Sequence, residues 1–186
     1  MPTASRTEVA QLTTTEAAVL ALLAIEGERS GYDLLKHVGR SIAHVWSPAR
    51  SGLYAVLPRL ERRGLALRRD VAQSSLPDKR LYAISPEGRH ALEAWLETVE
   101  PGNADTFRLK LFVGGLTTPG VLLEHVAQFR EDSEARLATL RRIEPTNTNR
   151  GHDWYHRRLL ELGIAQAELD LRWADDVARA LARGPE

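Results

Sequence analysis

Apolar residues recur every three or four positions through the first third of the chain, which is the spacing of one face of an α-helix. This pattern predicts helices over residues 13–26, 32–45 and 51–63. The first and third of these end at Gly27 and Gly64, and glycine commonly ends helices. The inward face of the third helix is predicted to consist of Leu53, Val56, Leu57 and Leu60.

The period then changes from helical to alternating. Leu65, Leu67 and Val71 stand at alternate or nearly alternate positions, and residues 81–84 form a second apolar run. A polar turn that contains a proline lies between the two runs, at 73–78. The segment therefore predicts a β-hairpin with a long tip.

A fourth helix is predicted to start at Ser85-Pro86, because serine caps helices and proline fits the first helical turn. Its apolar face comprises Leu92, Trp95, Leu96 and Val99. The run Pro101-Gly102-Asn103 ends this helix. We place a domain boundary there, which gives an N-terminal domain over 1–100 and a second domain over 101–186.

The second half of the chain predicts helices over 106–113, 118–143 and 153–182. In the last helix, apolar residues recur in alternating steps of four and three, the spacing of a coiled-coil seam. The seam consists of Leu160, Ile164, Ala167, Leu171, Ala174, Ala178 and Leu181. At 1.5 Å per residue this helix would be about 45 Å long. We expect it to pack on the preceding helix and on a second subunit; the alternative is a seam satisfied wholly within one chain.

Composition narrows the possible classes of protein. The 186 residues are 43% apolar and 27% charged, which is typical of a globular chain rather than a disordered one. No apolar run is long enough to span a membrane and the N-terminus lacks a signal-peptide core, so we expect a cytoplasmic protein. The absence of cysteine excludes disulfides, thiolate metal sites and cysteine nucleophiles.

The net charge of zero conceals an asymmetry. Residues 1–90 carry 13 basic and 9 acidic side chains, whereas residues 91–186 carry 12 and 16. Within 47–90 the counts are 9 and 4. A basic segment in a neutral chain is compatible with a half that binds nucleic acid joined to a half with another role, although a chance distribution of charge is the alternative.

Three motifs occur in order around the predicted hairpin. Gly31-Tyr32-Asp33-Leu34 opens the second helix, residues 51–65 read SGLYAVLPRLERRGL, and residues 77–89 read PDKRLYAISPEGR. In the second half, Leu109-Lys110-Leu111-Phe112, the Thr118-Pro119 helix start, and Leu159–Ile164 with Glu168 and Trp173 complete the pattern. Together these residues resemble the PadR family of bacterial transcriptional regulators, in its longer subtype, from about residue 12 to residue 181.

The resemblance implies a mainly α-helical fold, with an N-terminal winged helix-turn-helix followed by an all-helical C-terminal dimerisation domain. It also implies a dimeric repressor that releases a pseudo-palindromic operator in double-stranded DNA when a small effector binds. One departure concerns the third helix, where the family has proline directly after the tyrosine and a basic residue three positions later. This chain has Ala55 and Pro58 there. Pro58 cannot donate to the carbonyl of Tyr54, which predicts a kink.

The face of the third helix opposite its apolar side is predicted to contact DNA, together with the wing and the start of the second helix. The candidates are Tyr32, Arg50, Ser51, Tyr54, Lys79 and Arg80. Each basic residue has the alternative of a solvated surface charge, and Tyr54 has the alternative of a partly buried position. Four other arginines fit a DNA contact and a solvated surface charge about equally well: Arg62, Arg63, Arg68 and Arg69. A winged-helix module that binds protein and no DNA is the second hypothesis for the whole chain.

The remaining candidates concern ligands and chemistry. Aromatic side chains near the predicted domain junction could stack on a flat effector, although aromatics more often fill a core. The effector candidates are Trp46, Trp95, Phe107 and Trp154. His152 and His156 have the spacing of a metal pair on one helix face but lack an evident third ligand, so we expect no metal and no cofactor. No phosphate-binding loop or nucleophile motif occurs, so we expect no enzymatic activity.

Overall fold

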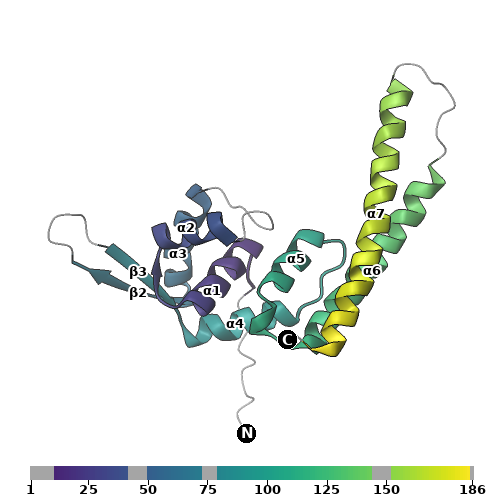
Figure 1. Cartoon of the computed structure of the whole chain (residues 1–186). Coiled ribbons are helices and arrows are strands. Elements are labelled where there is room, and N and C mark those ends of the chain that lie inside the picture. The colour runs from purple at the N-terminus through teal and green to yellow at the C-terminus, as the bar shows by residue number, and fades with distance from the viewer. Residues whose placement is uncertain (1–10, 42–49, 73–78, 144–151, 185–186) are drawn as a thin grey trace, which may run out of the picture. The chain divides into compact units, whose positions relative to one another are not determined.

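The computed structural model describes residues 11–41, 50–72, 79–143 and 152–184 of the chain (Figure 1). The described part is mostly helical, with one small antiparallel sheet. The elements are α1 (Thr14–Glu26), β1 (Arg29–Ser30), α2 (Gly31–Ser41), α3 (Arg50–Arg62), β2 (Ala66–Val71), β3 (Lys79–Ile84), α4 (Pro86–Glu97), α5 (Ala104–Phe112), the 3-10 turn η1 (Gly114–Leu116), α6 (Pro119–Arg142) and α7 (His152–Arg183).

The chain forms two compact units. The first contains Met1–Thr98 and Arg108–Thr117, and the second contains Val99–Phe107 and Thr118–Glu186. Helix α5 is therefore divided between them, its first residues belonging to the second unit and its last residues to the first.

The sheet of the first unit has three strands in the order β1-β3-β2. The predicted hairpin is present, and its strands pair from Ala66↔Ile84 to Val71↔Lys79. The sequence did not predict β1, which consists of two residues that pair with β3. The alternating pattern placed Leu67 on the apolar side of its strand, which is wrong. The Leu67 side chain is exposed, and the neighbouring Ala66 is buried.

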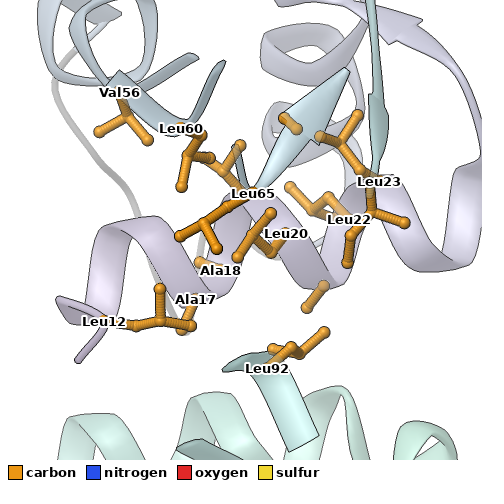
Figure 2. Packing of buried hydrophobic residues seen from close by; sticks show 14 of the residues in the cluster. Leu12, Ala17, Ala18, Leu20, Leu22, Leu23, Val56, Leu60, Leu65 and Leu92 are labelled. Atoms are coloured by element: carbon orange, nitrogen blue, oxygen red, sulfur yellow. The ribbon is translucent and has the colours of Figure 1, made fainter. Parts of the chain in front are cut away.

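Side chains from five helices and the sheet, most of them leucine and alanine, fill the core of the first unit (Figure 2). Helix α1 lies at its centre, with Ala17 through Leu23 all buried, since a helix apolar on every side belongs inside. The predicted inward face of α3 is confirmed by the burial of Leu53, Val56, Leu57 and Leu60.

Two local signals in the sequence position the helices of this unit. Thr13 and Glu16 form a capping box at the start of α1, in which each side chain accepts from the backbone N–H of the other. Ser85 caps α4 by accepting from the backbone N–H of Gly88, and its hydroxyl donates to the carbonyl of Gly64. A Cβ at Gly88 would lie 2.0 Å from the carbonyl oxygen of Leu65, so only glycine fits where α4 meets the backbone between α3 and β2.

The two longest helices that the structure describes, α6 and α7, lie side by side in the second unit (Figure 1). Phe107 stacks on Phe129 at 4.8 Å between ring centroids, and both rings meet the edge or face of Trp173. Arginines of α6 pair with acids of α7 along the helices. These pairs are Arg130–Asp175, Arg136–Asp170 and Arg141–Glu168.

The predicted seam of α7 faces the interior of this unit. Ala167 and Ala174 are fully buried within the single chain, and the other five seam residues are half-buried. The seam is thus already used within one chain over much of its length. Among the described residues of α7, five large apolar side chains remain exposed. Trp154 is one of them, and the other four form a neighbouring row, here called the α7 stripe: Tyr155, Leu159, Leu162 and Leu169.

Candidate nucleic-acid interface

The start of α2 is fixed by a reciprocal pair of side chains. The Ser30 hydroxyl accepts from the backbone N–H of Asp33 at 3.2 Å and donates to the Asp33 carboxylate at 2.7 Å. The backbone N–H of Ser30 also donates to that carboxylate. This capping box holds the first turn of α2, from which the Tyr32 side chain projects with 66% of its surface exposed.

Helices α2 and α3 approach closely at Gly31. A Cβ on this residue would lie 2.8 Å from Cε1 of the Tyr54 ring and 3.1 Å from a methyl carbon of Leu57. The Tyr54 ring therefore rests against the backbone at the start of α2. Half of the Tyr54 surface stays exposed, so the ring belongs to the surface as well as to this contact.

Helix α3 continues through Pro58, which lies inside the helix and is half-buried. Ala55 is exposed on the same face. Arg50 and Ser51 lie in the first turn of α3, and their side chains are outside the described part of the structure.

The wing residues Lys79 and Arg80 begin β3. The Lys79 ammonium lies 3.0 Å from the Asp33 carboxylate and so joins the wing to the start of α2. The pKa of Asp33 lies below its ordinary value, first because Ser30 donates a hydrogen bond to the carboxylate and next because of Lys79. Arg80 is exposed, opposite Asp70 in the strand register. Among the described residues it has no ion-pair partner within 4.0 Å.

These residues converge on one pocket of about 430 Å³ in the first unit. Four of the six predicted DNA contacts line it, namely Tyr32, Tyr54, Lys79 and Arg80. The rest of the lining is formed by Ser30, Gly31, Leu57, Pro58 and Tyr82. The side chains of lysine and arginine and the hydroxyl group of tyrosine are among the groups that commonly contact the phosphate oxygens and sugars of a nucleic-acid backbone.

Most other basic side chains of the region already have acidic partners. Arg68 makes two hydrogen bonds to Asp70, and Arg69 makes two to Glu28. Arg59 and Arg63 both bind Glu16. Three of the four arginines that the sequence left even between two roles are thus engaged within the chain, and Arg62 is exposed.

The sequence missed two members of this arrangement. Asp33 was part of a quoted motif, but its role in holding Lys79 depends on β3 lying beside α2, which no local pattern specifies. The Ser-x-x-Asp spacing at the start of α2 could have predicted the cap. Tyr82 is buried among charged neighbours, and burial raises the pKa of its hydroxyl.

The effector candidates lie in separate surroundings. Trp95 is buried in the first unit, with the Lys110 ammonium 4.6 Å from the ring centroid while the same ammonium donates to the carbonyl of Thr98. Phe107 belongs to the aromatic cluster of the second unit, and Trp154 is half-exposed on α7 against Tyr155. Trp46 lies outside the described residues.

The described residues contain no group of three or more metal-ligating side chains, and the side chain of His152 lies outside them. None of their helices is both long enough and apolar enough to cross a membrane.

Comparison with known families divides the chain in two. Residues 19–94 match the transcriptional regulator PadR-like family, and residues 105–182 match the family described as virulence activator alpha C-term. A probable transcriptional regulator of Mycobacterium tuberculosis is 29% identical over 174 residues, which cover 84% of this chain and 92% of the relative. The negative transcriptional regulator PadR of Bacillus subtilis is 31% identical over 102 residues, 51% of this chain and 53% of the relative.

Solved structures of the same Bacillus subtilis protein are also similar. The crystal structure of PadR with operator DNA has 22% identity and a TM-score of 0.47, covering 91% of this chain and 99% of that one. The structure with p-coumaric acid has 20% identity and a TM-score of 0.41, covering 91% and 96%. With both halves matched in order, the chain belongs to the PadR-like family of DNA-binding transcriptional regulators and carries a C-terminal extension.

Proposed function

We propose that this protein is a homodimeric repressor that binds a pseudo-palindromic operator and responds to a small aromatic effector. In this proposal residues 1–100 contact DNA, and residues 101–186 dimerise and participate in sensing. The observation that carries the proposal is the pocket where Tyr32, Tyr54, Lys79 and Arg80 meet.

The four pocket residues divide the work of binding. Arg80 is exposed and forms no ion pair within 4.0 Å among the described residues, so it can bind a phosphate without breaking a close pair. To bind a phosphate, the Lys79 ammonium must either contact Asp33 and the phosphate together or break its ion pair with Asp33. The hydroxyls of Tyr32 and Tyr54 donate to phosphate oxygens, and such contacts set the register of a protein on the duplex. Arg50 and Ser51, at the start of α3, are the proposed contacts to base edges.

Dimerisation is proposed through the α7 stripe and the half-buried part of the seam beside it. The exposed members recur at steps of four, three and seven, so they lie in one row of the helix. Such a row is unfavourable in water and suits a second copy of the same helix. Two winged helices held in this way would read half-sites about one helical turn apart.

The proposed effector class comes from the Bacillus subtilis relative, whose structure holds p-coumaric acid. Tryptophan fluorescence provides the test, with p-coumaric acid as the probe. If Trp95 takes part, Trp95→Phe removes the change in emission that the probe causes and Trp154→Phe retains it. No change in the wild-type emission would reject this effector for this chain.

The decisive experiment measures the affinity for the protein's own upstream promoter and for a scrambled duplex at several salt concentrations. We expect tighter binding to the promoter and a log–log salt slope of roughly −0.9 for each phosphate contact. Arg80→Gln should reduce that slope by about 0.9. Arg142→Gln removes an exposed arginine from α6 and should leave the slope unchanged. Equal, salt-insensitive binding to both duplexes would reject the proposal.

A further inference from the structure

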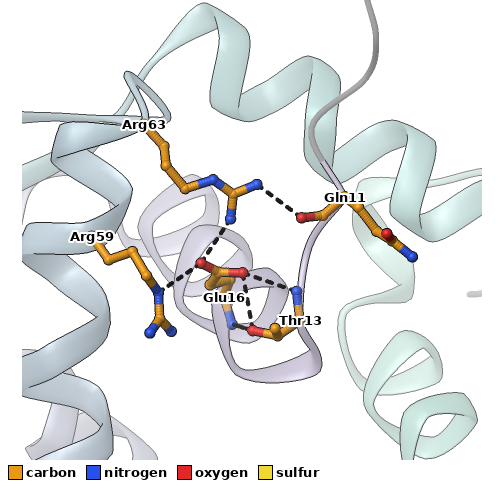
Figure 3. Close-up of polar contacts among 5 residues, drawn as sticks. All are labelled: Gln11, Thr13, Glu16, Arg59 and Arg63. Carbon is orange, nitrogen blue, oxygen red and sulfur yellow. Dashed lines mark hydrogen bonds and ion pairs between the residues drawn. The ribbon is translucent and has the colours of Figure 1, made fainter.

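Glu16 is a buried carboxylate that binds two arginines, Arg59 within the recognition helix α3 and Arg63 directly after its end (Figure 3). Its Oε1 accepts from Nε of Arg59 at 2.9 Å and from Nη1 of Arg63 at 2.7 Å. Its Oε2 accepts from the backbone N–H of Thr13 at 2.9 Å and from the Thr13 hydroxyl at 3.0 Å. One side chain thus caps α1 and joins it to the C-terminal half of α3.

The two arginines are held firmly but lie near the surface. Arg63 has a second contact, in which Nη2 donates to the carbonyl of Gln11 at 2.8 Å. The Arg59 side chain keeps 45% of its surface exposed and the Arg63 side chain 30%. Arg59 follows Ala55 by four residues and precedes Arg62 by three, so it borders the exposed face of α3. Without Glu16, both side chains are long enough to turn toward that face.

From this arrangement we infer that Glu16 is a specificity-determining residue, which withholds Arg59 and Arg63 from the DNA backbone and fixes the orientation of α3. The inference rests on the proposed DNA-binding role of the α3 face. Glu16 itself contacts no DNA in this account, and it acts as a positioning residue through the two arginines.

The physical reason concerns the difference between specific and non-specific binding. A cation that neutralises a phosphate adds affinity for every duplex, whatever its sequence. Two additional arginines beside the recognition face would therefore raise binding to all DNA and reduce preference for the operator. Because both arginines pair with a buried carboxylate, they are not available to bind phosphates of any duplex, and they hold α3 in place instead.

The test is Glu16→Gln, measured by fluorescence anisotropy on a scrambled duplex between 50 and 200 mM salt. Release of two arginines onto phosphates should steepen the log–log salt slope by up to about 1.8, at roughly 0.9 for each contact. Non-specific affinity at low salt should rise, and the ratio of operator affinity to non-specific affinity should fall.

Two further variants separate this role from a structural one. Glu16→Gln with Arg59→Gln and Arg63→Gln should return the salt slope to the wild-type value, because the released cations are gone. Arg59→Gln with Arg63→Gln in the wild-type background should leave the slope unchanged. Circular dichroism at the assay temperature establishes that each variant is folded.

Each failure has a distinct meaning. A folded Glu16→Gln variant with the wild-type slope would overturn the inference, because the released arginines would not reach DNA. A reduced slope in the double arginine variant would also overturn it, since both would already contact phosphate; this comparison decides even if Glu16→Gln does not fold. Wild-type protein that binds neither promoter nor scrambled duplex would instead reject the proposed function.

Discussion

The two units of this chain achieve stability in different ways. The first encloses a continuous core of leucine and alanine side chains and ties it together with a buried carboxylate. The second is mainly a pair of long helices with a narrow core, in which arginine–carboxylate pairs lie at the surface. It also exposes an apolar row, the α7 stripe. The first unit therefore buries its apolar surface within a single chain, whereas the second leaves exposed the apolar row to which the proposed dimer contact is assigned.

The strongest test of this contrast is a cavity in the first unit. Leu60→Ala removes a fully buried side chain from α3, and such substitutions cost about 2–5 kcal/mol. We expect that loss in the free energy of unfolding from denaturant titration, with the same value at low and high protein concentration. Ala138→Gly, at an exposed position of α6, should cost only about 1 kcal/mol. A loss for Leu60→Ala that depended on protein concentration would contradict the self-sufficiency of the first unit.

The buried carboxylate gives the first unit a dependence on acid. Burial raises the pKa of Glu16, but hydrogen bonds from Thr13, Arg63 and Arg59 outweigh it and lower the pKa from 4.5 to about 2. The folded state therefore gains stability that is fully present above about pH 4.5 and is lost as the pH falls toward 2. The shift corresponds to about 3 kcal/mol. Thermal unfolding between pH 6 and pH 2 should show this loss in the wild type and a smaller one in Glu16→Gln.

Much of the first unit could be predicted from the sequence, because its helices carry clear periodicity and end at recognisable caps. The capping box at Thr13 and Glu16 is one example. The second role of Glu16 could not be predicted, because Arg59 and Arg63 lie 43 and 47 residues away and meet it only after α1 packs on α3. The strand β1 was missed for a similar reason, since two residues carry no period.

In the second unit the sequence predicted the helices better than their faces. Helix α7 spans His152–Arg183, close to the predicted 153–182. Two rows of α7 have steps of four and three, and local pattern alone does not say which row meets α6. The small side chains of Ala167 and Ala174 allow the close approach of α6, so their row turns inward. The larger leucines of the α7 stripe stay outside.

The stripe provides the test of the second unit. Leu162→Glu places a carboxylate in the proposed dimer contact and should weaken dimerisation at least tenfold, about 1.4 kcal/mol, as measured by sedimentation equilibrium. The stability of the first unit should not change. Ala182→Glu, at an exposed position of the same helix that is not three, four or seven residues from any member of the stripe, serves as the matched control. An unaltered dimer in Leu162→Glu, or a monomeric wild type, would place the interface elsewhere or remove it.

The smallest expected effect concerns the surface pairs of the second unit. Arg130 binds Asp175 on α7 and Glu134 on its own helix, with each side chain about half exposed. Exposed ion pairs are typically worth about 0–1 kcal/mol. Arg130→Gln should therefore reduce the free energy of unfolding by less than 1 kcal/mol, and less still at high salt. A loss as large as that expected for Leu60→Ala would show that this surface pair stabilises the second unit as much as a buried leucine stabilises the first. It would contradict the contrast between the two units.

The contact between Gly31 and the Tyr54 ring has an evolutionary consequence. Because a Cβ at position 31 would lie 2.8 Å from that ring, the two positions do not vary independently. A lineage that acquires alanine or serine at 31 must either turn the half-exposed Tyr54 ring away from the start of α2 or replace it with a smaller residue. Either change alters the pocket that Tyr54 lines, so a substitution at one position changes which residues the other can carry.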